Sequence, residues 1–517
     1  MRLMENFGFL SILPPALAVI LAIVTKNVLV SLFTSILLGT VILFNGNIFY
    51  AVPAVFRDVL FKQAADGYNA SVIVLVLFIG GMVMLVTSSG GAEALALGAT
   101  KRIDSRKKAI LGAWILGLII WFSDFANGML VGPIFQPITD KLKISREKLA
   151  WIVDATSAPV CMLVPISGFG IFAMSCMEKE FAANNISLSV WDAFLQTIPL
   201  QFYCIGALLL VPLIAFLGID FGPMAKAEER VITTGQLHWP HAQPMGLGEP
   251  PALSKDAKPK MSLVVFPILA LFVIFFVILI ANGFPYKKTL GINIRTGLTT
   301  GYFIGGMICF TLMIYYKIRN FKETFDIYMN GMKNNLFLVM TLLFAWSLSS
   351  ICKDLGTAGY IVHMVEGSLP VFTVAPMFFF VACVISFATG TSYGTMAILV
   401  PIGVPMAISL GAPMIVTLAA IFSGAIFGDH CSPISDTTLI ASMGAACDHI
   451  EHVKTQLPYS IMIGVIGFVV YTISYWVSST AILLVFTIVG VVIVTFLCRR
   501  LWGIDVHQKV MKAMNDK

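Results

Sequence analysis

The sequence predicts an all-α polytopic membrane protein with about eleven transmembrane helices and two re-entrant hairpins. Composition is the first reason: 58% of the 517 residues are hydrophobic, 12% are charged, and the mean hydropathy is +0.91. A soluble globular protein carries about twice that charged fraction. Apolar runs of about 18 residues or more also recur along the whole chain, and each can cross a hydrocarbon core about 30 Å thick. These runs are continuous rather than alternating, which argues against membrane-spanning strands.

The apolar runs place the spans. We expect them at residues 7–24, 27–46, 70–90, 149–176, 193–216, 262–283, 298–316, 335–352, 414–447, 458–478 and 480–498. The first run has no clear small-x-small cleavage site, so we expect a retained helix rather than a signal peptide. Nine scattered cysteines without a Cys-x-x-Cys pattern indicate neither a disulfide framework nor a zinc ribbon. The net charge of +6 requires no nucleic-acid partner, because Lys and Arg lie mostly in short loops.

Two further apolar segments, 107–139 and 370–410, are each interrupted by a polar stretch that contains glycine. Basic residues flank the first segment on both sides, whereas the flanks of the second carry almost no positive charge. Because positive charge favours the cytoplasmic side, we expect two re-entrant hairpins that enter from opposite sides. Their tips would be "SDFANG" (Ser123–Gly128) and "ATGTSYGT" (Ala388–Thr395).

Counting spans puts the N-terminus outside and the C-terminus in the cytoplasm. The positive charges of Lys287, Lys288 and Arg295, which would then lie outside, oppose this orientation.

The two halves of the chain show the same order of elements. Each has an apolar span, a hairpin, a span with a polar interruption, and a Thr–Pro pair at a corresponding place (Thr197 with Pro199, Thr455 with Pro458). Hairpins that enter from opposite sides indicate an inverted-topology repeat, a common plan of secondary transporters. We expect N-terminal scaffold helices (1–69), a first repeat (70–216, with hairpin 107–139 and broken helix 149–176), a cytoplasmic linker (217–261), further scaffold helices (262–334), a second repeat (335–478, with hairpin 370–410 and broken helix 414–447), and a last helix and cytoplasmic tail (479–517). The linker is rich in Pro and Gly, so we expect it to be largely without packed structure.

The stretch "GDHCSPISDTT" (Gly428–Thr438) puts two carboxylates, a histidine and four hydroxyls inside the predicted span 414–447. A spanning helix must satisfy its backbone groups internally, and Pro433 removes a donor and clashes with the preceding turn. Gly428 and Pro433 therefore predict that the helix unwinds. In the first half, "DATSAP" (Asp154–Pro159) predicts the corresponding break. Freed carbonyls, carboxylates and hydroxyls can ligate Na⁺, and each break should meet the tip of its own hairpin.

The candidate ion- or substrate-binding residues are the polar groups at these breaks and tips. They are Asp124, Asn127, Asp154, Thr156, Ser157, Thr389, Thr391, Ser392, Asp429, His430, Ser432, Ser435, Asp436 and Thr437, with Pro159, Gly428 and Pro433 as helix breaks. A charged carboxylate at mid-membrane costs about 3 kcal/mol or more, so the four aspartates favour function over a structural pair or cap. His430 stays open between a proton carrier, a ligand and a hydrogen-bonded core histidine. We expect His449 and His452 at a cytoplasmic helix end.

Two other classes of protein are weighed against a transporter. In a zinc enzyme, Asp429, His430 and Cys431 would be the ligands, but three consecutive residues point in different directions on a helix, and no second cluster has ligand spacing. A passive channel would not need paired hairpins in inverted halves, which favour alternating access. We therefore expect no catalytic residue, and no cofactor apart from transported Na⁺.

"GDHCSPISDTT", followed by "DHIEHVKTQLPYS", closely resembles the signature of the NhaC-type sodium/proton antiporter family, within the broader ion transporter superfamily. "ISREKLAWIVDATSAPVC" and "DFGPMAKAEER" are similar to that family's long members. The resemblance runs from about the third span to the eleventh. It implies Na⁺-coupled transport by an elevator movement of hairpins and broken helices against a scaffold. Carried over by residue, it implies roles for Asp154, Asp429, His430, Ser432, Ser435 and Asp436.

The first hairpin departs from the family pattern. Long members often carry two adjacent acids and an aromatic residue before the asparagine, whereas this chain has Ser123, Asp124 and Phe125 ahead of Asn127. A serine thus replaces one acid, and Phe125 replaces the usual tyrosine. The loss of a carboxylate removes a possible proton carrier and raises the alternative of an organic solute.

These observations predict a sodium-coupled secondary active transporter, with Na⁺/H⁺ antiport as the first interpretation. In it, Asp154, Asp429 and Asp436 bind Na⁺ and protons in turn, with Na⁺ at Asp154, Asp436 and neighbouring hydroxyls and carbonyls. The alternative is Na⁺-coupled symport or exchange of an amino acid or small carboxylate. The expected partners are Na⁺ with H⁺ or a small organic solute, the bilayer of the cell inner (plasma) membrane, and a second copy in a homodimer formed through the first two and the seventh and eighth spans.

Overall fold

The computed structural model describes residues 7–25, 27–91, 94, 103–245, 259–284, 291–357, 360 and 370–505. Within these residues, nine helices are long and apolar enough to cross a membrane, and up to eleven spans result if each of two bent helix pairs counts as one. The prediction of a helical, multi-pass membrane protein with about eleven spans is confirmed. Lys287, Lys288 and the tail 506–517 lie outside the described residues.

The helices follow one another in chain order with short connections. They are α1 (Leu13–Thr25), α2 (Val28–Leu43), α3 (Ile48–Ala54), α4 (Phe61–Ala65), α5 (Gly67–Ser88), α7 (Arg106–Ile119), α8 (Asp124–Lys141), α9 (Arg146–Ala155), α10 (Ala158–Leu163), α11 (Gly168–Ala183), α12 (Val190–Thr197), α13 (Phe202–Leu217), α14 (Gly222–Thr234), α15 (Ser262–Ala281), α16 (Gly291–Tyr315), α17 (Phe321–Asn334), α18 (Leu336–Asp354), α20 (Val374–Thr389), α21 (Ser392–Ser409), α22 (Met414–Cys431), α23 (Asp436–Gly444), α24 (His449–Ile473) and α25 (Thr480–Trp502). Short 3₁₀ helices lie at Gly8–Ile12, Ile198–Leu200 and Val371–Thr373, and a π-helical segment at Val55–Leu60 joins α3 to α4.

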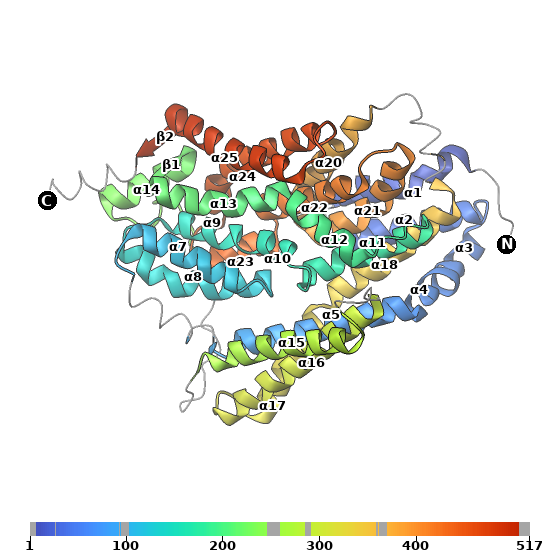
Figure 1. Cartoon of the computed structure of the whole chain (residues 1–517), viewed down its shortest axis with the longest axis horizontal. Helices are drawn as coiled ribbons and strands as arrows, with labels where there is room; N and C mark the ends of the chain where they lie inside the picture. The colour runs from blue at the N-terminus through green and yellow to red at the C-terminus, as the bar shows by residue number, and fades with distance from the viewer. Residues whose placement is uncertain are drawn as a thin grey trace.

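Two groups of helices divide the molecule. Figure 1 shows α5, α15, α16 and α17 as a bundle along one side, and α18 leads from this bundle into the larger body. In that body α18 packs against α2, α11 and α21. The bundle exposes many apolar side chains, as a lipid-facing surface requires, since burial against other helices covers only a third of the most apolar window of α15.

The helical hairpins lie where the sequence predicts them. α7 and α8 form the first, and α20 and α21 form the second. In the second, Gly390 adopts φ +70° to end α20, a conformation that glycine adopts without steric cost. α8 and α21 are both 18 residues long, and each has prolines at its tenth and fourteenth positions (Pro133 and Pro137; Pro401 and Pro405). The second arms of the two hairpins thus share a length and a proline pattern.

Both predicted helix interruptions are present. α9 ends at Ala155, and Pro159 lies in the first turn of α10, where its missing N–H is tolerated. The two halves of the first broken helix, Arg146–Leu163 and Gly168–Ala183, meet at a bend of 42°. In the second half α22 ends at Cys431 and α23 begins at Asp436, so Pro433 lies in the unwound segment as predicted.

The prediction that Gly428 breaks the helix is wrong. Gly428 lies inside α22, and a Cβ atom added there would lie 2.3 Å from the backbone nitrogen of Phe387 in α20. The glycine is therefore a close-packing position: α22 and α20 touch there backbone to backbone, which only a residue without a side chain allows.

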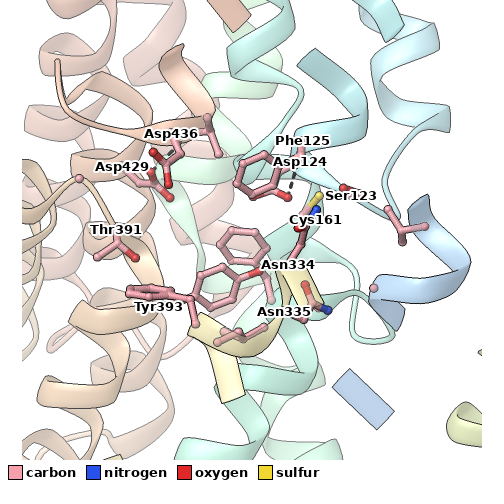
Figure 2. Close-up of a pocket in the computed structure, with 18 of the residues that line it drawn as sticks. Ser123, Asp124, Phe125, Cys161, Asn334, Asn335, Thr391, Tyr393, Asp429 and Asp436 are labelled. Atoms are coloured by element: carbon pink, nitrogen blue, oxygen red, sulfur yellow. Dashed lines mark hydrogen bonds between the residues drawn. The ribbon is translucent and has the colours of Figure 1, made fainter. Parts of the chain in front are cut away.

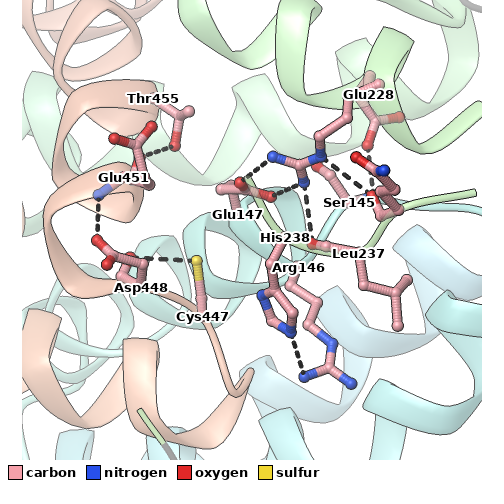
Figure 3. Close-up of polar contacts among 12 residues, drawn as sticks. Ser145, Arg146, Glu147, Glu228, Leu237, His238, Cys447, Asp448, Glu451 and Thr455 are labelled. Carbon is pink, nitrogen blue, oxygen red and sulfur yellow. Dashed lines mark hydrogen bonds and ion pairs between the residues drawn. The ribbon is translucent and has the colours of Figure 1, made fainter. Parts of the chain in front are cut away.

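The prediction that the linker is largely without packed structure is wrong for residues 219–245. Strand β1 (Ile219–Phe221) pairs antiparallel with β2 (Gly503–Asp505), and α14 packs on α9 and α24. Arg230 of α14 donates two hydrogen bonds, of 2.9 and 3.0 Å, to the carboxylate of Glu147 at the start of α9 (Figure 3). Both side chains are nearly inaccessible to solvent. The sequence "AKAEER" looks like a solvated charge run, but its charges pair inward with those of α9.

A second buried charge cluster lies beside this pair. Lys148 Nζ lies 2.7 Å from Asp220 Oδ2, and Arg106 contacts Glu228. Burial alone would raise the pKa of Glu228, but the cations of Arg106 and Lys148 outweigh burial and lower that pKa. The linker and β1 are thus held to the broken helix by paired charges.

Replacement of Arg230 by Met leaves the Glu147 carboxylate buried without its partner. We expect this change to cost about 3–5 kcal/mol of stability, since a buried charge without its counter-ion is strongly unfavourable. The double variant Glu147→Gln/Arg230→Met should recover most of the loss. Thermal unfolding of the purified protein measures both, and Arg57→Met, at an exposed ion pair, is the matched control. An Arg230→Met variant as stable as the wild type would contradict this interpretation.

Candidate functional site

A cavity of about 400 Å³ lies where the two hairpin tips and the second helix interruption meet the helix bundle. The tip of the first hairpin contributes Ser123, Asp124 and Phe125, and the start of α21 with the residues before it contributes Thr389, Gly390, Thr391 and Tyr393. The α22–α23 segment contributes Asp429, Ile434, Asp436 and Thr437, while Asn334, Asn335, Phe337 and Leu338 come from the α17–α18 junction. Residues from six parts of the chain thus enclose one space.

Three carboxylates face this cavity. Figure 2 shows Asp429 and Asp436 on one side and Asp124 on the other. Asp436 and Asp124 are the first residues of α23 and α8, and the positive end of a helix dipole favours a carboxylate there. No Lys, Arg or His lies among the residues that line the cavity in the described part of the chain. The cavity is therefore an acidic site without a counter-ion of its own.

Asp429 is held by hydroxyl groups. Ser392 of the second hairpin donates to Oδ2 at 2.8 Å, and Ser435 of the interruption donates to Oδ1 at 2.6 Å. Thr437 lies 3.4 Å from the same Oδ1. Hydrogen bonds to a carboxylate favour its charged form. The same hydroxyl oxygens are also the type of ligand that Na⁺ accepts, together with carboxylate oxygens.

The remaining predicted hydroxyls and the amide tie each hairpin to its own interruption. Asn127 Nδ2 donates to the carbonyl of Thr156 at 2.7 Å, and Ser157 donates to the carbonyl of Asp124 at 2.9 Å. In the second half Ser432 donates to the carbonyl of Phe387 at 2.7 Å. The expectation that each break meets its own hairpin tip agrees with this geometry. These bonds use the side chains of Asn127, Ser157 and Ser432, which do not line the cavity.

Two of the predicted threonines are occupied within their own helices. Thr156 and Thr389 each donate to a carbonyl four residues earlier, at 2.9 and 2.8 Å. Such bonds are common for threonine in membrane helices. Thr389 and Thr391 nevertheless line the cavity, whereas Thr156 does not.

Asp154 and His430 lie outside the cavity. Asp154 is fully buried, and its Oδ2 accepts a 2.8 Å hydrogen bond from Gln456 of α24. The hydroxyl of Tyr203 lies 2.6 Å from His430 Nδ1. The structure thus separates the predicted aspartates into a cavity group (Asp124, Asp429 and Asp436) and a buried one. Among the described residues, no group of three or more His, Cys, Asp or Glu side chains could hold a metal ion, so the zinc-enzyme alternative has no support here.

Several residues at these sites were not predicted from the sequence. Asn334, Asn335 and Tyr393 line the cavity, and Gln456 and His452 approach Asp154. The expectation that His452 lies at a helix end is wrong, because it is fully buried. The signal that could have identified them is polarity inside apolar runs: Asn334 and Asn335 directly precede an apolar segment, and Gln456 lies one turn after His452 on the same helix face.

The comparison with known proteins was made against this geometry. The profile described as the Na⁺/H⁺ antiporter family matches residues 179–476, more than half of the chain. The chain belongs to the Na⁺/H⁺ antiporter family. It is therefore a sodium-coupled membrane transporter, and the resemblance seen in the sequence motifs is confirmed.

Relatives and one solved structure support this assignment. An uncharacterized protein of Haemophilus influenzae is 31% identical over 486 residues, which cover 90% of this chain and 91% of that protein. The malate-2H⁺/Na⁺-lactate antiporter of Bacillus subtilis is 28% identical over 212 residues, or 40% of this chain and 43% of the relative. The YdaH transporter of Alcanivorax borkumensis has a TM-score of 0.57 at 14% identity and covers 82% of this chain and 89% of its own; this likeness concerns the fold alone.

Gly428→Ala tests the close contact that positions Asp429. The added methyl group would meet backbone atoms of α20, and such overpacking costs about 1–3 kcal/mol. Because α20 carries the hairpin tip, we expect both a lower melting temperature and weaker Na⁺ binding. The matched control is Gly467→Ala, where the nearest atom would lie 3.5 Å away. The contact would lose its proposed importance if the two variants behaved alike in thermal unfolding and Na⁺ titration.

Proposed function

We propose that the protein exchanges Na⁺ for H⁺ across the membrane and binds the cation between Asp429 and Asp436, with Asp124 on the opposite wall. The observation that carries this proposal is one cavity lined by three carboxylates and no cationic side chain. Carboxylates without a counter-ion inside a membrane protein are costly unless a cation or a proton neutralises them. Because one carboxylate set cannot hold both at once, each displaces the other during the cycle.

The proposed ligands differ in part from those expected from the sequence. Asp154 does not line the cavity, so the proposal assigns Na⁺ to Asp429 and Asp436 with the hydroxyls of Ser435 and Thr437. Oxygen ligands of this kind suit a hard cation. Asp154 then contributes from the buried network behind the cavity.

We also propose an inverted repeat and an elevator movement. The equal lengths and matching prolines of α8 and α21 support two related halves, 70–216 and 335–478. The cavity lies between the hairpin tips and residues of α5 and the α17–α18 junction, which is the boundary that such a movement would use. In this proposal the α5, α15, α16 and α17 bundle stays fixed. A homodimer, the inner membrane and a cytoplasmic C-terminus belong to the same proposal.

Neutralising Asp429 tests cation binding directly. Asp429→Asn keeps the shape but removes the charge, so we expect Na⁺-driven proton flux to fall by about a hundredfold, equivalent to about 2.7 kcal/mol. The assay uses purified protein in liposomes that hold a pH-sensitive dye, with an inward Na⁺ gradient and a clamped membrane potential. Asp192→Asn, at an exposed carboxylate that bonds Ser189, is the control. Flux that survives in Asp429→Asn would remove this residue from the site.

A second candidate function is Na⁺-coupled transport of an organic solute. The cavity volume of about 400 Å³ exceeds what a bare ion needs and lies in the range of small-molecule sites. The related malate-2H⁺/Na⁺-lactate antiporter bears the names of organic anions. Here, however, the lining is acidic and includes the aromatic faces of Phe169 and Tyr393. This combination favours a solute with a positively charged amine.

Solute dependence separates the two functions. If the cavity binds an organic amine, Na⁺ flux into liposomes should rise several-fold when basic amino acids or diamines are added, and stay unchanged with malate or lactate. The same dye-loaded liposomes report on proton flux in parallel. Stimulation by dicarboxylates alone would contradict the charge argument, and Na⁺-driven alkalinisation without any solute would favour Na⁺/H⁺ exchange.

A further inference from the structure

A chain of buried polar side chains extends from Asp154 to the corner between α23 and α24. Gln456 Nε2 donates to Asp154 Oδ2 at 2.8 Å, and Gln456 Oε1 lies 2.8 Å from His452 Nε2. His452 Nδ1 lies 2.8 Å from the hydroxyl of Ser442, which lies 3.0 Å from His449 Nδ1. None of these four side chains lines the acidic cavity. Ser442 is thus a hydroxyl between two imidazoles, inside the protein.

The outer partners determine which ring nitrogen carries hydrogen. His449 Nε2 lies 2.7 Å from the carbonyl oxygen of Pro433, which can only accept, so this nitrogen is a donor. Gln456 Nε2 also contacts the carbonyl oxygen of His430, which places the amide oxygen on the side of His452. His452 Nε2 is therefore a donor as well. In a neutral histidine the other nitrogen must then be an acceptor.

Ser442 cannot satisfy both acceptors. Its hydroxyl has one hydrogen, yet it faces His449 Nδ1, His452 Nδ1 and the carbonyl of Thr438, which is 2.8 Å away. With both histidines neutral, at least one buried Nδ1 has no donor, which is unfavourable. With one added proton, the protonated ring donates to Ser442 Oγ and Ser442 donates to the other ring. The geometry is complete only when the trio holds one extra proton.

We propose that His449, Ser442 and His452 form a proton-binding site that is separate from the acidic cation cavity. The proton occupies either of two arrangements. In the exchange between them, the proton on one Nδ1 passes to Ser442 Oγ while the hydroxyl hydrogen passes to the other Nδ1. Bonds made and broken balance, and no other reactant is needed. The exchange moves the charge between half-buried His449 and fully buried His452.

The surroundings can support this charge. His452 Nε2 lies 3.9 Å from Asp154 Oδ2, and an anion at this distance stabilises an imidazolium. The titratable groups that face the pair are Asp154 from α9, His430 from α22, His241 from the linker, and Asp448 and Glu451 from α24 itself. His430 opposes the charge if protonated, but its Nδ1 is bonded to Tyr203. Within Na⁺/H⁺ antiport, on which this use of the site rests, the trio would hold the exchanged proton.

The variant Ser442→Ala removes the bridge and leaves both histidines. Two transport measurements are compared in liposomes: Na⁺-driven proton flux as a function of pH, and exchange of ²²Na⁺ for Na⁺, which needs no proton. We expect proton flux to fall at least about tenfold, with a changed pH profile, while Na⁺/Na⁺ exchange stays near the wild-type rate. Ser442→Thr keeps a hydroxyl and should restore the flux. Ser423→Ala, at a buried serine distant in sequence, is the control.

If Ser442→Ala does not fold, His449→Gln replaces it, since an amide still donates to Pro433 but binds no proton. Wild-type flux and pH profile in Ser442→Ala or His449→Gln would overturn the proposal.

A spectroscopic measurement separates this proposal from the transport function. Infrared difference spectra of ring-¹⁵N-histidine-labelled protein, recorded against pH without Na⁺, report imidazolium directly. We expect a titrating histidine signal in the wild type that is lost in His449→Gln and shifted in Ser442→Ala. This result supports the site even if the liposomes show no Na⁺/H⁺ exchange, in which case only the proposed function fails. Identical histidine spectra in all three proteins would overturn the proton site.

Discussion

The site depends on hydrogen bonds that close the two helix interruptions. Inside a bilayer, backbone groups released by an unwound helix have no water to bond, so protein groups must satisfy them. Asn127 does this for the carbonyl of Thr156 in the first half, and Ser432 links the second interruption to the carbonyl of Phe387. Each interruption is therefore stable only while its hairpin stays in place. A hairpin and its broken helix form one unit, and the cavity opens where the tips of the two units approach each other.

Helix α22 connects the two polar regions that result. Asp429 and His430 are neighbours near its end, yet Asp429 faces the cavity while His430 faces the buried network. The backbone carbonyl of His430 accepts from Gln456, whose amide also bonds Asp154. A change in charge at Asp429 thus has a short route, through one turn of helix and one glutamine, to the histidines of α24. Cation and proton can be held in separate places and still be coupled.

The linker belongs to the same unit as the site. Glu147 and Lys148 open the first broken helix, and their charges pair with Arg230 and Asp220 in the linker and β1. Tyr459 of α24 adds a 2.8 Å hydrogen bond to Asp220. The linker thus holds α9 and α24, which carry Asp154 and Gln456, in fixed register. Such buried pairs are costly to break, so they favour one arrangement of these helices over others.

Much of the fold follows from the sequence alone, because a bilayer imposes simple rules. Continuous apolar length determined the spans, proline positions determined the interruptions at Pro159 and Pro433, and loose polar tips marked the hairpins. Close packing decided what these rules do not cover. Gly428 is a contact between backbones, and α14 is held by inward charges, because both depend on neighbours distant in the chain. The sequence likewise identified four important aspartates, but only the tertiary structure separated Asp154 from the other three. It also brought His452 and Gln456 to Asp154, since hydrogen bonds across about 300 positions leave no local pattern.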